Sequence, residues 1–255
     1  MHYFEAESAF TESYNSGGYI EPWVSYTEGK GLDYNKPDYT KVPFIIEALG
    51  SGNITWKLGT KTVQYSKNGC SWETMDSGTT ISVAEGDEIQ FKGTNTDYCG
   101  NTISATTQFN VRGNIMSLTD GDDFETADTV NANGFRDLFS GCTYLVSACD
   151  LKLPSTTLAS SCYYCMFQGC TRITTAPELP ATALTNNCYK SMFQGCTSLN
   201  YIKAMFKTTP STSYTGNWVS GVASRGTFVK NSAATWNVTG ANGVPTYWTV
   251  ETSSE

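Results

Sequence analysis

The chain has 255 residues, with 24 acidic and 16 basic side chains, one histidine and nine cysteines. This length suffices for two domains, or for one domain and a repeat array. The acidic balance and the scattering of Lys and Arg as single residues argue against a nucleic-acid-binding groove, which needs clustered basic side chains.

The beginning of the chain, MHYFEAE, has neither the basic start nor the apolar run of a secretory signal. No segment has the apolar length that a membrane span needs. We therefore expect a protein made in a cytoplasm, with no membrane partner.

Residues 1–40 are rich in aromatic side chains spread among Gly, Ser, Asn and Glu, without a sustained helix or strand period. Disordered tails avoid aromatic residues, so we interpret this segment as an extended docking arm. The alternative is one or two strands that complete the next domain. The candidate anchors of the arm are Phe4, Phe10, Trp23, Tyr26 and Tyr34.

Residues 41–113 predict a small β-sandwich of immunoglobulin-like size, because short strand-like runs alternate with turn residues. Asn68-Gly69 is a hairpin turn signal, since both residues tolerate positive φ. The predicted strands are 42–48, 53–58, 62–66, 71–75, 80–83, 88–92 and 105–111.

Residues 114–137 form a junction that caps the start of the following region. It contains four acids, at Asp120, Asp122, Asp123 and Glu125. Carboxylates on one short loop are suited to calcium, but the full spacing of a calcium loop is missing. A solvated linker or helix start is the alternative reading.

Residues 138–206 contain a repeat. The octets LFSGCTYL (138–145), MFQGCTRI (166–173) and MFQGCTSL (192–199) place Phe, Gly, Cys and Thr at the same offsets, with steps of 28 and 26 residues between the Phe positions. A period in the twenties indicates a leucine-rich-repeat solenoid, whose successive turns bury a shared core. We expect one ladder of Phe139, Phe167 and Phe193, and a second of Cys142, Cys170 and Cys196.

Within each repeat, the segments after the Cys (144–147, 172–175 and 198–202) predict short strands. Segments 155–164 and 181–190 predict helical or irregular returns that start after a Leu-Pro turn. The repeat ends after Ile202, so residues 207–255 are expected to form a cap over the last turn. In this cap 217–222 predicts one helical turn, 226–230 predicts a strand, and three Trp residues provide the covering side chains.

The phrases CYYCMFQGCTRITTAPELPATALTNNCYKSMFQGCTSL and NWVSGVASRGTFVK resemble BspA-like leucine-rich-repeat proteins of gut Bacteroidales. The resemblance is greatest to the short versions carried by their phages and prophages, of the crAss-like phage type, and covers about half of the chain. It implies a binding and adhesion module and leaves the ligand open.

Catalytic and metal-binding patterns are weak in this sequence. His2 has no second histidine to form a triad or a Cys-His pair. The Cys162–Cys165 spacing suits zinc or redox chemistry, but no second pair with this spacing provides the remaining ligands. We predict no catalytic residue, no metal and no cofactor, while a disulfide among Cys70, Cys99, Cys149 and Cys165 stays open.

Together these features predict a mainly β protein with short helices: an N-terminal arm, a β-sandwich, a short solenoid and a C-terminal cap. The favoured function is that of a phage virion protein, a head or tail fibre or decoration subunit. It would be a homo-oligomer that contacts capsid or tail proteins through its N-terminal part and displays the repeats to a host glycan or protein.

Two alternatives remain, a bacterial cell-surface adhesin and, less favoured, a glycan-active enzyme. The candidate binding face consists of outward positions of the repeats, and a plain solvated surface is the alternative for them. The candidates are Tyr144, Arg172, Thr174, Ser198, Asn200 and Tyr201.

Overall fold

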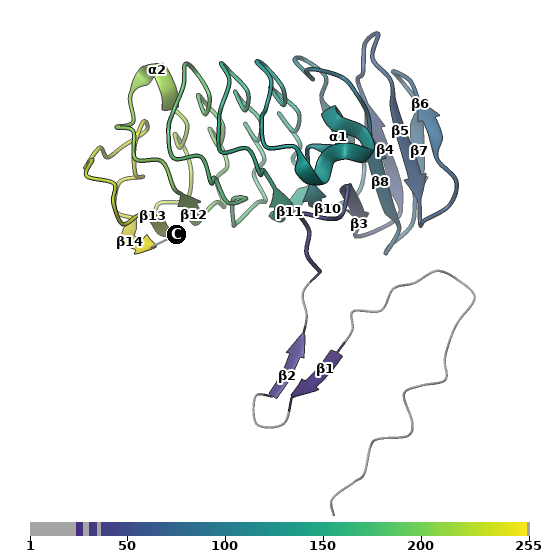
Figure 1. Ribbon diagram of the computed structural model, residues 1–255, viewed down its shortest axis with the longest axis horizontal. Coiled ribbons are helices and arrows are strands. Elements are labelled where there is room, and N and C mark those ends of the chain that lie inside the picture. The colour runs from purple at the N-terminus through teal and green to yellow at the C-terminus, as the bar shows by residue number, and fades with distance from the viewer. Residues whose placement is uncertain (1–23, 28–30, 35–36, 254–255) are drawn as a thin grey trace, which may run out of the picture. The chain divides into compact units, whose positions relative to one another are not determined.

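The computed structural model describes residues 24–27, 31–34 and 37–253, and falls into two compact units, 1–37 and 38–255 (Figure 1). In the first unit β1 (Val24–Thr27) pairs antiparallel with β2 (Gly31–Tyr34). Of the predicted arm anchors, Phe4, Phe10 and Trp23 lie outside the described residues. Tyr26 and Tyr34 lie in the two strands, and the docking role of the arm stays a prediction.

The second unit begins with two β-sheets, as the strand-and-turn pattern predicts. The larger sheet has the order β11-β10-β3-β8-β5-β6, and the smaller has the order β7-β4-β9. All pairs are antiparallel except β10–β11. The strands are β3 (Phe44–Ala48), β4 (Gly52–Trp56), β5 (Val63–Lys67), β6 (Glu73–Met75), β7 (Thr80–Val83), β8 (Glu88–Lys92), β9 (Ile103–Ala105), β10 (Phe109–Asn114) and β11 (Leu145–Lys152).

The two sheets pack face to face, because each strand turns alternate apolar side chains inward. Trp56 of β4 meets Phe91 of β8 edge-on, with ring centroids 5.6 Å apart. The β5–β6 hairpin turns at Asn68 and Gly69, whose φ angles are 53° and 71°, so the predicted turn is confirmed.

The prediction of one strand over 105–111 is wrong. The chain leaves the small sheet after Ala105, which pairs with Ile54, and enters the large sheet at Phe109, which pairs with Ala48. Between them Thr106 accepts a hydrogen bond from the Asn53 N–H, which fixes the crossing. Two short strands in different sheets therefore replace one continuous apolar run.

The junction contains α1 (Ser117–Asp120) and the 3-10 helix η1 (Gly121–Thr126). Ser117 is fully buried at the start of α1. Its hydroxyl donates to the Phe91 carbonyl and accepts from the Phe44 N–H, at 2.8 and 2.9 Å. This hydroxyl ties the junction to two strands of the large sheet.

The repeat region folds into turns of chain that lie side by side (Figure 1). We call four matching segments rungs 1 to 4: residues 133–142, 161–170, 187–196 and 213–222. Alternate N–H groups of one rung donate to carbonyls of the next, such as Phe139 to Met166 and Phe167 to Met192, both at 2.9 Å. The same pattern continues from Phe193 to Trp218 at 2.8 Å, so stacking extends one rung beyond the sequence repeat.

Positive φ angles recur at every fourth residue of a rung. In rung 2 they lie at Ser161, Cys165 and Gly169, and in rung 3 at Asn187, Ser191 and Gly195. An α-helix cannot accommodate left-handed residues at this interval, so the backbone makes consecutive tight turns instead. The helical alternative for the returns at 155–164 and 181–190 is therefore wrong, and so is the helical turn predicted at 217–222. The chain there forms irregular turns, and the nearby helix is α2 (Thr212–Thr215).

The interior of the rungs contains the ladders that the repeat predicts. Phe139, Phe167 and Phe193 stack with centroid separations of 5.2 and 5.6 Å and interplanar angles of 13° and 12°. The Cys170 and Cys196 thiols donate to the Phe139 and Phe167 carbonyls, at 3.1 and 3.0 Å. The two predicted ladders are confirmed. The core that contains them is continuous with the core between the sheets.

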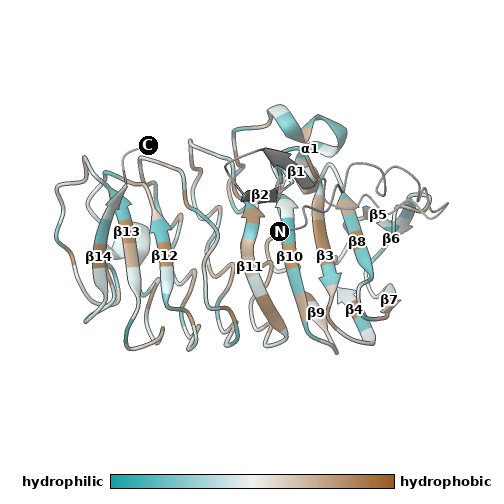
Figure 2. Ribbon diagram, turned by 90° about the horizontal axis from the view of Figure 1, so that it is seen from below, coloured by the Kyte–Doolittle hydropathy of each residue, from teal (hydrophilic) through white to brown (hydrophobic). Residues whose placement is uncertain are grey.

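Regular strands form after rungs 1, 3 and 4 but not after rung 2. The prediction of a strand at 172–175 is wrong, because Thr175 makes a single isolated bridge with Tyr201. The last parallel sheet comprises β12 (Tyr201–Ala204), β13 (Thr227–Asn231) and β14 (Thr249–Ser253). Figure 2 shows these strands beside the turns that separate them from β11.

Three tryptophans close the final turn, as predicted for the cap. Trp218, Trp236 and Trp248 are buried, and each indole N–H has a backbone partner. The acceptors are the carbonyls of Gly243, Phe206 and Ala223, at 2.9, 3.1 and 2.8 Å. Satisfied indoles allow large aromatic side chains to cover the end of the core without leaving a buried donor unpaired.

Candidate functional site

The predicted binding face lies on matching positions of successive turns. Tyr144, Arg172 and Ser198 are separated by the same steps of 28 and 26 residues as the Phe ladder, and all three are exposed. Thr174 and Asn200 form a second exposed row, and the Asn200 N–H donates to the Thr174 carbonyl at 2.8 Å. The structure therefore brings these five candidates into two short rows.

The sixth candidate, Tyr201, lies at the start of β12 and is half-buried, so its side chain is less exposed than those of the other five.

Hydrogen bonds between turns fix the orientation of these rows. Arg172 Nε donates to the Thr143 carbonyl at 2.9 Å, which holds the guanidinium against the preceding turn. Thr197 Oγ1 makes a longer contact of 3.5 Å with the Thr171 carbonyl. Arg172 is the one charged side chain among the six candidates, so this face presents a single cation among hydroxyl, amide and phenol groups.

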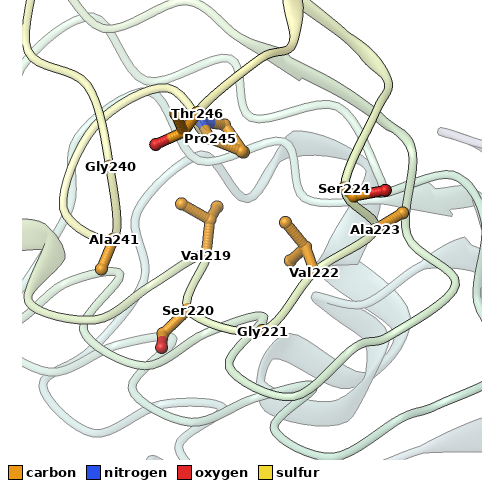
Figure 3. A pocket seen from close by; sticks show the side chains of 10 residues that line it. All are labelled: Val219, Ser220, Gly221, Val222, Ala223, Ser224, Gly240, Ala241, Pro245 and Thr246. Atoms are coloured by element: carbon orange, nitrogen blue, oxygen red, sulfur yellow. The ribbon is translucent and has the colours of Figure 1, made fainter.

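A shallow hollow of about 240 Å³ lies at the C-terminal end of the first row (Figure 3). Ser224 lines it, and Ser224 follows Ser198 by the repeat step of 26 residues. In Figure 3 the side chains of Val219 and Val222 face Pro245 across the opening. The hollow thus combines an apolar floor with a hydroxyl at its rim, and it continues the predicted face.

Sequence reasoning missed this hollow because rung 4 lacks the Phe-Gln-Gly-Cys motif. One signal remains in the sequence: Val219-Ser-Gly-Val222 retains an apolar residue, glycine and a second apolar residue at the repeat offsets. Gly221 has φ 77°, and a Cβ added there would lie 3.6 Å from the Gly195 Cα. Such close stacking identifies Gly221 as the next member of the glycine column formed by Gly169 and Gly195.

The interior thiols are poor nucleophiles. Burial raises the pKa of Cys142 and of Cys196 to about 12, and raises the pKa of Cys170 well above the usual range. The thiolate is the reactive form, so these residues serve as small apolar side chains at neutral pH. Cys162, of the Cys162–Cys165 spacing, is also fully buried, and burial raises its pKa.

The acidic junction makes local contacts. Lys92 Nζ lies 2.9 Å from Asp122 Oδ1, and Thr119 Oγ1 donates to Asp120 Oδ2 at 2.6 Å. Within residues 24–27, 31–34 and 37–253, no three His, Cys, Asp or Glu side chains group in a way that would hold a metal ion.

Comparisons with family models, curated proteins and solved structures find no match for this chain. In the part of the chain that the structure describes, no helix combines the length and apolar character needed to span a membrane. The rows of exposed side chains, with the hollow at their end, are thus the feature from which a function is inferred.

Proposed function

We propose that this chain is a phage virion protein, a fibre or decoration subunit of the head or tail, whose stacked turns are a leucine-rich-repeat solenoid that displays a binding face. The supporting observation is the two rows of exposed residues on successive turns, above a core of stacked Phe rings. The repeat phrases, with their resemblance to proteins of Bacteroidales phages and prophages, favour a virion over other settings.

The rigidity of the rows suits recognition of a surface. Backbone hydrogen bonds connect each rung to the next, so the side chains above them are held at constant intervals with little freedom to rearrange. Preorganised contact groups lower the entropic cost of binding. The ligand class that we propose is a host-surface glycan or protein, bound through Arg172, the neighbouring polar side chains and the hollow of Figure 3.

Purified particles test the virion assignment. Phage particles from a lysate of the host that carries this gene are banded on a density gradient, and peptides of the banded fraction are identified by mass spectrometry. We expect peptides of this chain to band with the capsid proteins. Absence from the particles, together with surface labelling of intact cells, would instead support the bacterial adhesin.

Charge reversal tests the binding face separately. The variant Arg172→Glu should reduce adsorption of the labelled protein to host cells at least tenfold, because it removes the cation and the contact with the Thr143 carbonyl. Lys57→Glu is the matched control, since Lys57 is an exposed cation on the sandwich. Equal adsorption by both variants and the native protein would exclude the rows as the binding face.

A further inference from the structure

A second hollow, of about 480 Å³, lies at the other end of unit 38–255, between the large sheet and the 3-10 helix η1. Its volume falls within the range of roughly 300–1,000 Å³ that is usual for small-ligand sites. Unlike the hollow of Figure 3, it is lined by charged groups, hydroxyls and an amide, and none of the predicted binding residues belongs to it.

The floor of this cleft is a row across three neighbouring strands. Thr74 of β6 pairs with Gln64 of β5, and Gln64 pairs with Lys92 of β8. Paired residues project from the same face of a sheet, so a hydroxyl, an amide and an ammonium group lie next to one another. All three line the hollow.

An aromatic side chain lies beside this floor. Trp72 lies just before β6, two residues from Thr74, and 37% of its surface is exposed. Lys92 Nζ lies 4.5 Å from the centroid of its indole ring. The indole is thus held by a cation at one side while part of its surface is open to solvent.

The wall of the cleft contains the acids at the end of α1 and the start of η1. Asp122 accepts from Lys92 Nζ at 2.9 Å, yet its side chain remains 85% exposed, so the carboxylate keeps free lone pairs. Asp120 and Asp123 also line the hollow. The ammonium of Lys92 already lies against Asp122, where it would repel a divalent cation.

These groups match the chemistry of a sugar ring. A pyranose presents C–H groups on its faces, which pack on an indole, and hydroxyls around its edge, which both donate and accept hydrogen bonds. We propose that the cleft between the floor of β5, β6 and β8 and the 3-10 helix η1, with Trp72 beside it, is a saccharide-binding subsite. Three carboxylates against one ammonium give it a negative balance, so it takes neutral sugars and disfavours uronic or sialic acids.

Titration of the full chain with short oligosaccharides tests this proposal. Maltotriose, cellotriose, chitotriose and mannotriose are titrated by isothermal calorimetry, with trigalacturonate as the acidic probe. At least one neutral trisaccharide should bind at least tenfold more tightly than trigalacturonate. The proposal is overturned if no neutral probe binds, if trigalacturonate binds best, or if the bound probe is cleaved, which would make the cleft a hydrolase site.

Variants locate the bound sugar. Trp72→Ala should weaken binding of the selected probe at least tenfold, and Trp72→Phe should restore part of it because an aromatic surface remains. Tyr247→Ala is the matched control, since Tyr247 is 86% exposed at the far end of this unit. Unchanged binding by Trp72→Ala, or equal loss with Tyr247→Ala, would overturn the assignment.

This subsite does not depend on the proposed binding face of the repeats. Trp72→Ala tests trisaccharide binding in the cleft, whereas Arg172→Glu tests adsorption of the repeat face to cells. The two experiments therefore fail separately. Circular dichroism of each variant confirms that a lost signal reflects the site and not the fold.

Discussion

The sandwich and the stacked turns reach the same buried state by different means. In the sandwich, antiparallel strands alternate inward and outward side chains, and partners such as Phe44 and Phe91 face each other from neighbouring strands. In the stack, like residues lie on like residues, as Phe167 does on Phe139 and Phe193. The sandwich thus pairs residues across neighbouring or opposed strands, whereas rungs 1 to 3 stack aromatic rings at matching positions of successive turns.

The sandwich and the stacked turns also differ in backbone conformation and hydrogen bonding. Most residues of the sandwich strands are extended, and positive φ angles occur at turns such as Asn68-Gly69 and at Gly113 within β10. The rungs use a left-handed residue at every fourth position and hydrogen-bond to the next rung through alternate N–H groups. The stack therefore combines long-range hydrogen bonding with little regular strand, and the two regions join where β10 pairs in parallel with β11.

The largest expected effect comes from removal of a ring from either region. Phe167→Ala and Phe91→Ala should each lower the free energy of unfolding by about 3–5 kcal/mol, because both rings are fully buried. Urea denaturation followed by circular dichroism measures this change, and the exposed Thr174→Ala should change it by less than about 0.5 kcal/mol. The continuous core predicts one transition for both variants. Two separate transitions would show that the regions unfold independently.

A smaller effect is expected at left-handed glycines. Gly169→Ala in rung 2 and Gly69→Ala in the hairpin should each lower the free energy of unfolding by about 1–2 kcal/mol. The φ angles are 74° at Gly169 and 71° at Gly69, and a residue with a side chain is strained at such angles. A Cβ at Gly169 would lie 3.7 Å from the Gly141 Cα, an ordinary contact. Similar decreases in the free energy of unfolding, measured by chemical denaturation, would show that the cost comes from the positive φ alone. A much larger loss at Gly169 would show that the stack also restricts the spacing of its rungs.

The pH dependence of stability tests a contact that belongs to the sandwich alone. Asp87 accepts from Lys67, from the Ala84 N–H and from Asn68, and these partners lower its pKa to about 2. A carboxyl whose folded pKa is depressed stabilises the fold above its unfolded pKa of about 4, and this stability is lost as the pH falls towards 2. Melting temperatures at pH 6 and pH 3 should therefore converge for Asp87→Asn and the native protein as the pH is lowered. A constant difference between the two proteins would assign the effect of Asp87 to packing.

Thiol labelling should distinguish the regions without altering stability. Cys70, Cys99 and Cys149 are exposed, whereas Cys142, Cys170 and Cys196 of the ladder are buried with raised pKa values. At pH 8 we expect the three exposed thiols to react rapidly with a disulfide reagent such as Ellman's, and the ladder thiols to react only after addition of urea. Rapid labelling of Cys170, located by peptide mapping, would show that the stack opens locally.

Several features were predictable from local pattern. The hairpin at Asn68-Gly69 follows from two residues that tolerate positive φ, and strands 80–83 and 88–92 follow from alternation between turn residues. The Phe and Cys ladders follow from equal spacing of identical residues, because a common period places them at the same level of successive turns. These features share one property: each is encoded by neighbouring residues or by a fixed interval.

Other features depended on contacts that no local pattern records. Residues 105–111 have the composition of one strand, yet they divide between two sheets because their partners, Ile54 and Ala48, lie in different sheets. The fourth rung carries Trp218 where rung 1 carries Leu and rungs 2 and 3 carry Met. The hydrogen bond from Phe193 therefore shows that this segment belongs to the stack, and the motif does not. The cleft beside Trp72 likewise depends on how η1 lies across the end of β8.

The sequence alone thus determined the mainly β composition, the period of the repeat and the residues that form its interior ladders, because these properties are repeated or local along the chain. Tertiary structure decided where the sandwich merges with the stack, how many turns the stack contains and which polar groups converge beside Trp72. These outcomes depend on pairing between residues far apart in the chain, and such pairing is selected by packing of the whole core.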